Sequence, residues 1–264
     1  MAITTLDGVI AAAKQRVLIT KSASRTSVAA APFSVFDLAG TPGAGTLAGT
    51  STTTGVVPTD ATAGCPTINA FGGGNTGYIA RIEGNSQVAC RIQLYDMLWK
   101  AGAYAFNVST TGQTPTSYSS RVPGGTDYTG LELWLEQVTA GTLVQNVNVN
   151  YNNEAGTAHS TGVTACPAAM ILGRMFQLPL LSGDKGIQGV TGVAGSVASA
   201  GTFNLLVMRP LGEVRIRVAN DGVVQDALST GLPIVFTDSA LVMIVSADST
   251  ATSVPELVID VING

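Results

Sequence analysis

Charge is what this sequence has least of. Asp, Glu, Lys and Arg make up only 11% of the 264 residues, whereas about 25% is usual in a globular domain. The 13 basic residues are outnumbered by 17 acidic ones, so the basic stripe typical of a nucleic-acid-binding surface is not expected. Disorder is equally disfavoured, because 45% of the residues are hydrophobic. We therefore expect a folded protein with a nearly neutral surface and no nucleic-acid partner.

Histidine and cysteine are also scarce. His159 is the only histidine, so a Ser-His-Asp triad must use it, and the sequence contains no G-x-S-x-G nucleophile elbow. A metal site built on histidine lacks its second ligand. We expect His159 to lie on a hairpin surface or at an interface. Three scattered cysteines are too few for a disulfide framework, and we expect Cys65, Cys90 and Cys166 to be reduced and buried, with a Cys65–Cys166 bridge as the less favoured alternative.

Carboxylate pairs are the remaining source of enzymatic chemistry. Glu132 and Glu136 share one face of a predicted strand, about 13 Å apart at 3.3 Å per residue, which is too far for a glycosidase pair. Asn220, Asp221 and Asp226 lack EF-hand spacing for calcium. We expect Glu132 and Glu136 to be solvated. The same is expected of four further acids that are isolated in the sequence: Glu83, Asp96, Asp127 and Glu213. We assign no catalytic, cofactor-binding or metal residues and expect no enzyme.

Two glycine patterns resemble known motifs, a dinucleotide-binding loop and a collagen helix, but neither pattern fits its motif well. Gly72, Gly74 and Gly77 match G-x-G-x-x-G, but the dinucleotide fingerprint needs a strand before it and a helix after it, and a strand is predicted to follow here. Glycine also recurs at every third position over 183–195. The absence of proline and the β-branched residues between these glycines favour a bent strand or a glycine-rich loop over a collagen helix.

Long apolar runs are missing too. No uninterrupted apolar segment approaches the ~18 residues of a membrane-spanning helix, and the first residues carry no basic cluster of a secretory signal. We therefore expect neither a leader nor a membrane partner.

Small and hydroxylic residues are abundant, with 31 Gly, 31 Thr and 19 Ser. They concentrate over residues 40–77, which we predict to be a long loop ordered by a partner or laid over a surface. Residues 5–16 show helical periodicity, with Thr5 or Asp7 as the cap. Such a short helix is marginal alone, so it must dock on its own domain or on a neighbouring subunit.

Strand signals dominate the rest of the chain. Val147, Val149 and Tyr151 alternate with asparagines, and Asn152–Gly156 reads as the hairpin loop that follows. Turns are predicted at Gly84–Asn85 and Asn220–Gly222, and a helical turn or corner at Asp96–Ala101. The other predicted strands lie at 78–82, 89–95, 131–136, 157–163, 203–208, 214–218, 234–236, 241–246 and 257–262.

Short strands separated by turns predict an all-β fold, namely an antiparallel β-sandwich or a jelly-roll-like barrel with a short N-terminal helix or arm and long Gly/Thr-rich loops. We predict an arm over residues 1–30 and a single β-rich domain over 31–264. Pro210-Leu211-Gly212 marks a possible C-terminal hairpin region over 210–264. The six large aromatic residues that stand out are expected in the core or at subunit contacts: Tyr95, Trp99, Tyr104, Phe106, Trp134 and Tyr151.

Sequence stretches spread over nearly the whole chain resemble a family of tailed-bacteriophage virion proteins. The resemblance begins at MAITTLDGVI over residues 1–10 and continues through GTPGAG at 40–45 and LYDMLW at 94–99. Further matching stretches are GLELWLE at 130–136, YNNEAGT at 151–157, FQLPL at 176–180, GTF at 201–203, RPL at 209–211 and GLP at 231–233. These are structural turns and strands, and the resemblance transfers no catalytic residue.

The resemblance implies a non-enzymatic capsid decoration or cement protein, located on the capsid surface of a virion assembled in the host cytoplasm. Its expected partners are further copies of itself, with a trimer favoured, and the phage major capsid protein. The residue 1–30 arm and the 40–77 loop would reach across subunits. A tail fibre or spike that binds the host is the first alternative, and a capsid shell subunit is the second.

Overall fold

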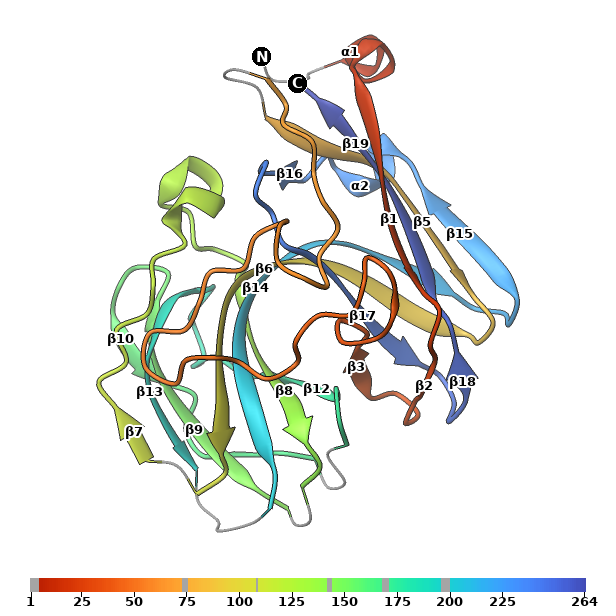
Figure 1. The fold of residues 1–264 in the computed structure, drawn as a ribbon. Coiled ribbons are helices and arrows are strands. Elements are labelled where there is room, and N and C mark those ends of the chain that lie inside the picture. The colour runs from red at the N-terminus through yellow and green to blue at the C-terminus, as the bar shows by residue number, and fades with distance from the viewer. Residues whose placement is uncertain (1–4, 73–75, 108, 142–143, 168–170, 196–199) are drawn as a thin grey trace. The chain divides into compact units, whose positions relative to one another are not determined.

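Antiparallel β-sheet makes up almost all the regular structure of this chain, as the computed structural model in Figure 1 shows. The structure describes residues 5–72, 76–107, 109–141, 144–167, 171–195 and 200–264. Among them are two short helices, α1 (Leu6–Ala11) and α2 (Ala227–Thr230), and two 3-10 turns, η1 (Ser119–Arg121) and η2 (Pro123–Gly125). The predicted all-β, sandwich or jelly-roll-like class is confirmed.

The chain forms two compact units that interleave in the sequence. Unit 1 comprises Met1–Gly45, Thr59–Asp96 and Leu211–Gly264, and unit 2 comprises Thr46–Pro58 and Met97–Pro210. Two long strands, β6 (Cys90–Ala105) and β14 (Thr202–Ile216), each contribute residues to both units.

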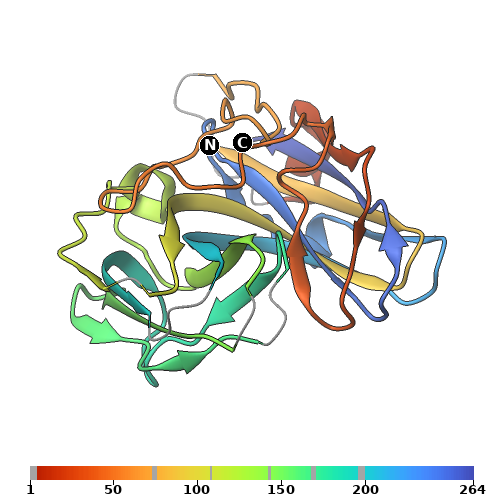
Figure 2. The same ribbon diagram turned by 60° about the horizontal axis from the view of Figure 1, so that its bottom comes forward.

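Unit 1 encloses a core between two sets of strands. In its larger sheet the strands follow the order β15-β5-β19-β1-β4, with β16 also paired to β5, and Figure 2 shows the long strands of this sheet from a second side. Opposite lie β17, β3 and the first part of β6. Aliphatic side chains such as Ile79, Ile259, Ile92 and Met243 fill the space between. The bounds are β1 (Lys14–Lys21), β3 (Pro32–Ser34), β4 (Gly40–Thr41), β5 (Gly77–Ser86), β15 (Asp221–Gln225), β16 (Ile234–Val235), β17 (Leu241–Ala247) and β19 (Glu256–Asn263), with β2 (Arg25–Thr26) paired to β18 (Thr252–Ser253).

Unit 2 is likewise built from two sets of strands around an apolar core. One has the order β10-β9-β13-β7, with β11 also on β9, and the other contains β12-β8-β14 followed by the second part of β6. Leu133, Leu135, Phe203 and Leu205 lie in the same core as Val149 from β9. The bounds are β7 (Ser109–Thr111), β8 (Glu132–Thr139), β9 (Asn146–Asn153), β10 (Ala158–Ser160), β11 (Thr164–Ala165), β12 (Met175–Leu178) and β13 (Ile187–Gly195).

Alternation of side chains explains the elements that were predicted correctly. In β9 the side chains of Val147, Val149 and Tyr151 are buried while the asparagines between them are more exposed. The hairpin from β9 to β10 forms as expected. The glycine-rich segment is the bent strand β13, whose register against β9 shifts at two places. A bulge of this kind is where glycine is tolerated inside a strand.

The predicted helix over residues 5–16 is too long. Helix α1 ends at Ala11, and Lys14–Lys21 is strand β1, which pairs with β19 and buries Val17 and Ile19. These two residues are β-branched and spaced by two, so they favour a strand over a helix. The division into an arm over 1–30, one domain over 31–264 and a hairpin region over 210–264 stays a prediction.

Two local predictions are wrong because long strands run through the residues concerned. Gly84 and Asn85 lie inside β5, and Asp96–Ala101 lies inside β6. Pro210-Leu211-Gly212 lies inside β14, and the division between the two units falls between Pro210 and Leu211. At Gly84 a Cβ atom would come within 2.3 Å of the Val214 side chain, so the glycine here permits close packing and marks no turn.

The predicted loop over residues 40–77 carries little regular structure, but its middle part is bound to its own unit. Among the described residues of this range, only β4, an isolated bridge at Val56 and the start of β5 are regular. Trp99 Nε1 donates to the Thr54 carbonyl at 2.9 Å, and Gln113 Nε2 donates to the Thr52 carbonyl at 2.6 Å. The chain's own side chains therefore order Thr46–Pro58, so no neighbouring subunit is needed for that.

Candidate functional site

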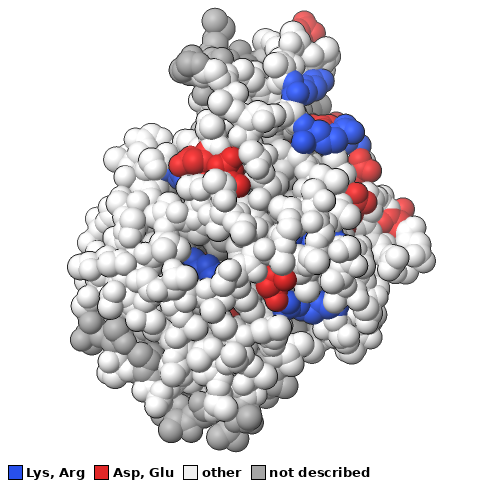
Figure 3. Space-filling view, viewed as in Figure 1, with Lys and Arg blue, Asp and Glu red and all other residues white. Residues whose placement is uncertain are grey.

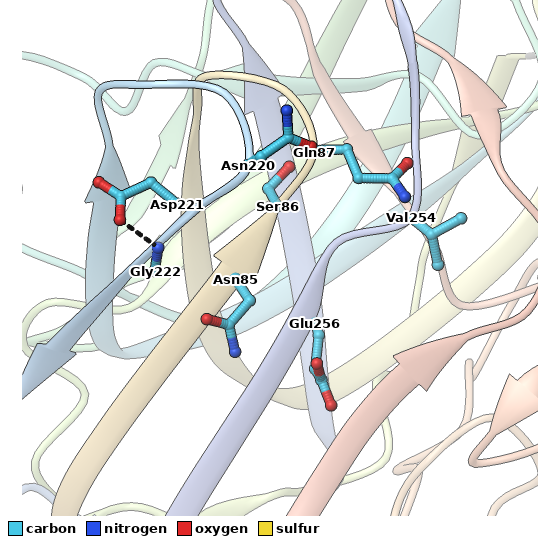
Figure 4. Close-up of a pocket in the computed structure, with 8 residues that line it drawn as sticks. All are labelled: Asn85, Ser86, Gln87, Asn220, Asp221, Gly222, Val254 and Glu256. Carbon is cyan, nitrogen blue, oxygen red and sulfur yellow. Dashed lines mark hydrogen bonds between the residues drawn. The ribbon is translucent and has the colours of Figure 1, made fainter.

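An open polar hollow of about 390 Å³ lies in unit 1, between the ends of β5, β15 and β19 (Figure 4). Seven of its eight lining residues are polar or glycine. They are Asn85, Ser86, Gln87, Asn220, Asp221, Gly222 and Glu256, with Val254 as the one apolar member.

Two carboxylates give this hollow its charge. Asp221 Oδ1 accepts from the Gly222 amide at 2.8 Å, and Glu256 Oε1 accepts from Thr20 Oγ1 at 3.0 Å. The predicted turn at Asn220–Gly222 forms here, with Asn220 at a φ of 60°, a conformation that asparagine tolerates. The lining offers amide and carboxylate oxygens to a neutral or cationic ligand and no basic side chain to an anion.

His159 lies on β10 of the β9–β10 hairpin with its side chain 28% exposed, and its ring is held by a buried carboxylate in unit 2. Its Nδ1 lies 2.8 Å from Asp184 Oδ2, and Asp184 also accepts from Tyr151 Oη at 2.6 Å and from Asn153 Nδ2 at 2.9 Å. The side chain of Asp184 is only 5% exposed. This Asp184 cluster (Tyr151, Asn153, His159 and Asp184) fastens the β9–β10 hairpin to the loop before β13.

Hydrogen bonding sets the protonation of this cluster. Burial by itself raises the pKa of Asp184, but the bonds from Tyr151, Asn153 and His159 outweigh burial and hold that pKa below its usual value. Burial, followed by the bond to Asp184, raises the pKa of Tyr151 to about 12. Asp184 is therefore an ionised acceptor at neutral pH, and Tyr151 is a donor.

We expect the Asp184 cluster to make unit 2 sensitive to acid. Because the folded pKa of Asp184 is below the unfolded one, its stabilisation is present above about pH 4 and is lost as the pH falls through the folded value. Urea unfolding of wild type and Asp184→Asn between neutral pH and pH 3 measures this, and the difference in unfolding free energy should shrink toward low pH. Asp7→Asn, at an exposed position in α1, is the control. A difference that stays constant across this range contradicts the assignment.

A second buried polar cluster in unit 2 joins three strands. Glu136 Oε2 lies 3.5 Å from Lys100 Nζ and accepts from Asn204 Nδ2 at 2.8 Å. Glu136 is 2% exposed, so the expectation that it is solvated is wrong. Strand β8 is buried on both faces from Leu133 to Val138, which the alternation of Leu and Glu in the sequence does not reveal.

Helix α1 carries two large exposed apolar side chains. Leu6 is 56% exposed and Ile10 is 64% exposed, and no residue of α1 is buried. The two side chains are four residues apart and so share one face of the helix. Thr5 caps the helix by accepting from the Gly8 amide at 3.1 Å. Figure 3 shows that most of the face in view carries no charged side chain.

The remaining predicted residues have ordinary structural surroundings. The three cysteines are free and buried, as predicted, and burial raises the pKa of Cys166 to about 11. The six selected aromatic residues are all buried. Asp96 is also buried and accepts from Ser239 Oγ and the Ala240 amide, so it is not solvated as expected. Glu83 pairs with Arg81, and Glu213 pairs with Arg91 at 2.7 Å.

The glycine pattern Gly72, Gly74 and Gly77, which matches G-x-G-x-x-G, is followed by a strand and not by a helix. Gly77 starts β5, and Gly74 lies outside the described residues. Within the described part of the chain, no group of three or more His, Cys, Asp or Glu side chains could hold a metal ion. No helix among the described residues has both the length and the apolar character to cross a membrane.

Comparisons with known proteins give only remote likenesses. No protein-family model and no curated protein sequence matches the chain. Among solved structures, the chain is similar to a chain in the structure of infectious bursal disease virus Gt strain, with a TM-score of 0.20 and 9% sequence identity. The match covers 96% of this chain and 81% of the viral chain. A crystal structure of the VP2 subviral particle of the same virus gives a TM-score of 0.19 and 8% identity, over 95% and 80% of the two chains. Scores at this level do not establish a common fold, so the proposals below depend on this chain's own features.

Proposed function

We propose that this chain is a non-enzymatic structural protein of a virion, most specifically a decoration or cement protein on the capsid of a tailed bacteriophage. It acts by burying surface against neighbouring subunits. In this proposal it forms a homo-oligomer, with a trimer favoured, and binds the major capsid protein.

The exposed apolar face of α1 is the observation that carries the proposal. A six-residue helix is too short to be stable by itself, and Leu6 and Ile10 point away from the core of their own unit. Exposed apolar side chains grouped on one element favour contact with another protein. A neighbouring subunit that covers this face would order the helix and gain apolar burial at once.

The neutral surface supports the same proposal. Permanent subunit contacts bury about 2,000 Å² or more and are more apolar than other surfaces. Charged side chains oppose such burial because each must be desolvated, and this chain has few of them. Closed rotational symmetry is the usual arrangement of such copies, and a trimer matches the threefold points of an icosahedral shell.

The abundance of the protein in purified virions tests the proposal. A decoration protein occurs in a number of copies comparable to that of the shell subunit, and quantitative mass spectrometry of virions measures the ratio. Few copies per particle would favour the tail fibre or spike. Capsids that assemble with this chain as their sole shell component would favour a shell subunit.

Charges placed on α1 are expected to weaken assembly without unfolding the chain. Each buried apolar side chain contributes about 1.5–3 kcal/mol, so Leu6→Glu with Ile10→Glu should weaken association at least tenfold. Light scattering gives the oligomeric state, and co-sedimentation with capsids gives binding. Leu228→Glu, at an 81% exposed position in α2, is the matched control. Unchanged association of the double variant would contradict the role of α1.

A further inference from the structure

The buried cluster of Lys100, Glu136 and Asn204 combines three chemically complementary groups on three strands. Lys100 lies on β6, Asn204 on β14 and Glu136 on β8, and β14 runs between the other two strands in the sheet. Asn204 and Glu136 are directly opposite each other in the register of β14 and β8. All three side chains are almost fully buried.

The amine and the carboxamide meet at one carboxylate oxygen. Glu136 Oε2 lies 3.5 Å from Lys100 Nζ and 2.8 Å from Asn204 Nδ2. Because both nitrogen atoms are close to this one oxygen atom, they are also close to each other. The Asn204 carbonyl oxygen accepts from the Gly49 amide at 2.8 Å. The site thus holds a nucleophile, an acyl group, a carboxylate that can transfer protons, and a backbone donor on the acyl oxygen.

The surroundings fix this geometry. Lys100 Nζ donates to the Thr46 carbonyl at 3.1 Å, and Asn204 Nδ2 donates to the Leu47 carbonyl at 2.6 Å. The segment that starts at Thr46 therefore covers the cluster. At Gly102 a Cβ atom would come within 2.3 Å of Asn204 Oδ1, so the absence of a side chain there leaves room for the amide. Fixed reactants in a site from which water is excluded are the conditions that accelerate acyl transfer.

We propose that Lys100 and Asn204 form an intramolecular isopeptide bond, with Glu136 as the proton-transfer group. Lys100 Nζ gives a proton to Glu136 and attacks Asn204 Cγ, and the Gly49 amide stabilises the negative charge that develops on Oδ1. The Cγ–Nδ2 bond then breaks. Both protons lost by the Nζ ammonium pass by way of Glu136 to Nδ2, which leaves as ammonium, and Glu136 returns to its carboxylate form. One ammonium side chain and one primary amide become one secondary amide and free ammonium, without oxidant or reductant.

This bond would link β6 and β14 covalently. Such a crosslink resists mechanical and thermal opening of the sheet irrespective of what the protein binds, so the inference stands apart from the proposed function. It assigns the three side chains a chemical role that a plain buried ion pair does not have.

Intact-mass spectrometry of the purified, folded full-length chain tests the bond. The expected mass is lower than the sequence mass by one ammonia, and a proteolytic digest should contain a branched peptide that joins the segment around Lys100 to the segment around Asn204. The wild-type result decides without any variant. A folded wild-type protein at full sequence mass overturns the proposal, as does an ammonia loss that the digest places at another residue.

Variants assign the roles within the bond. Lys100→Arg and Glu136→Gln should both show their full sequence masses. Asn204→Asp should instead lose one water, because a carboxyl group can accept the same amine. Lys14→Arg, at an exposed position in β1, is the control and should keep the ammonia loss. A crosslinked peptide that persists in folded Glu136→Gln at wild-type yield would overturn the role of Glu136.

Discussion

Replacing Arg121 with Met is expected to lower the free energy of unfolding by about 3 kcal/mol. Arg121 lies in η1 and is fully buried. Its guanidinium donates to the Pro58 carbonyl, and Nη2 donates to the Met97 carbonyl at 2.6 Å. The side chain thereby ties the end of the Thr46–Pro58 segment to β6. Met fills much of the volume but leaves two buried carbonyls without these donors, each at a cost of about 1–3 kcal/mol.

Urea unfolding followed by circular dichroism measures this loss. Arg217→Met, at an exposed position after β14, is the matched control and should change stability by less than about 0.5 kcal/mol. Arg121→Lys retains the charge but cannot present two donors in the planar geometry of a guanidinium, so it should recover only part of the loss. A change as small as that of the control would show that Arg121 does not hold the segment.

Local pattern was sufficient to predict most of the longer strands. Val147, Val149 and Tyr151 alternate with asparagines, so the buried face of β9 can be read from the sequence. The same reasoning failed for β8, where Glu136 is buried on the face assigned to solvent. A period of two shows which residues share a face, but what covers that face depends on distant parts of the chain.

The polar clusters could not be predicted from sequence spacing. Lys100, Glu136 and Asn204 are far apart in the sequence and come together only through the order of three strands in one sheet. His159 in β10 and Asp184 in the loop before β13 are 25 residues apart in the sequence. The one available signal was a charge inside an apolar strand: Lys100 directly follows Trp99, and Glu136 directly follows Leu135. A charge in that setting is buried only where a partner meets it.

The two proposals concern stability at two levels, namely between subunits and within one unit of the chain. A capsid-associated protein gains from contacts between subunits, which α1 can provide, and from a unit that does not open under load. The covalent link proposed for β6 and β14 would serve the second need, and the Asp184 cluster and Arg121 fasten loops to the same unit. Mass spectrometry of the folded chain and copy number in the virion test the two proposals independently of each other.

Replacing Trp99 with Ala should destabilise unit 2 by about 3–5 kcal/mol, the usual cost of removing a large aromatic side chain from a core. Trp99 is fully buried in the core of unit 2, and its indole nitrogen donates to the Thr54 carbonyl. Gly55 packs so closely that a Cβ atom there would lie 2.4 Å from the indole ring, and its φ is +62°. The ring therefore both fills the core and holds the covering segment.

Two conservative variants separate these contributions of Trp99, with unfolding again followed by circular dichroism. Trp99→Phe keeps much of the apolar volume but loses the hydrogen bond, so it should lose less stability than Trp99→Ala. Gly55→Ala should also destabilise, because its Cβ must displace the indole and its backbone conformation disfavours alanine. Val144→Ala, at an exposed position, is the control. If Gly55→Ala is as stable as wild type, the segment does not pack on Trp99 as the structure shows, and the covering of the Lys100, Glu136 and Asn204 cluster must be reconsidered with it.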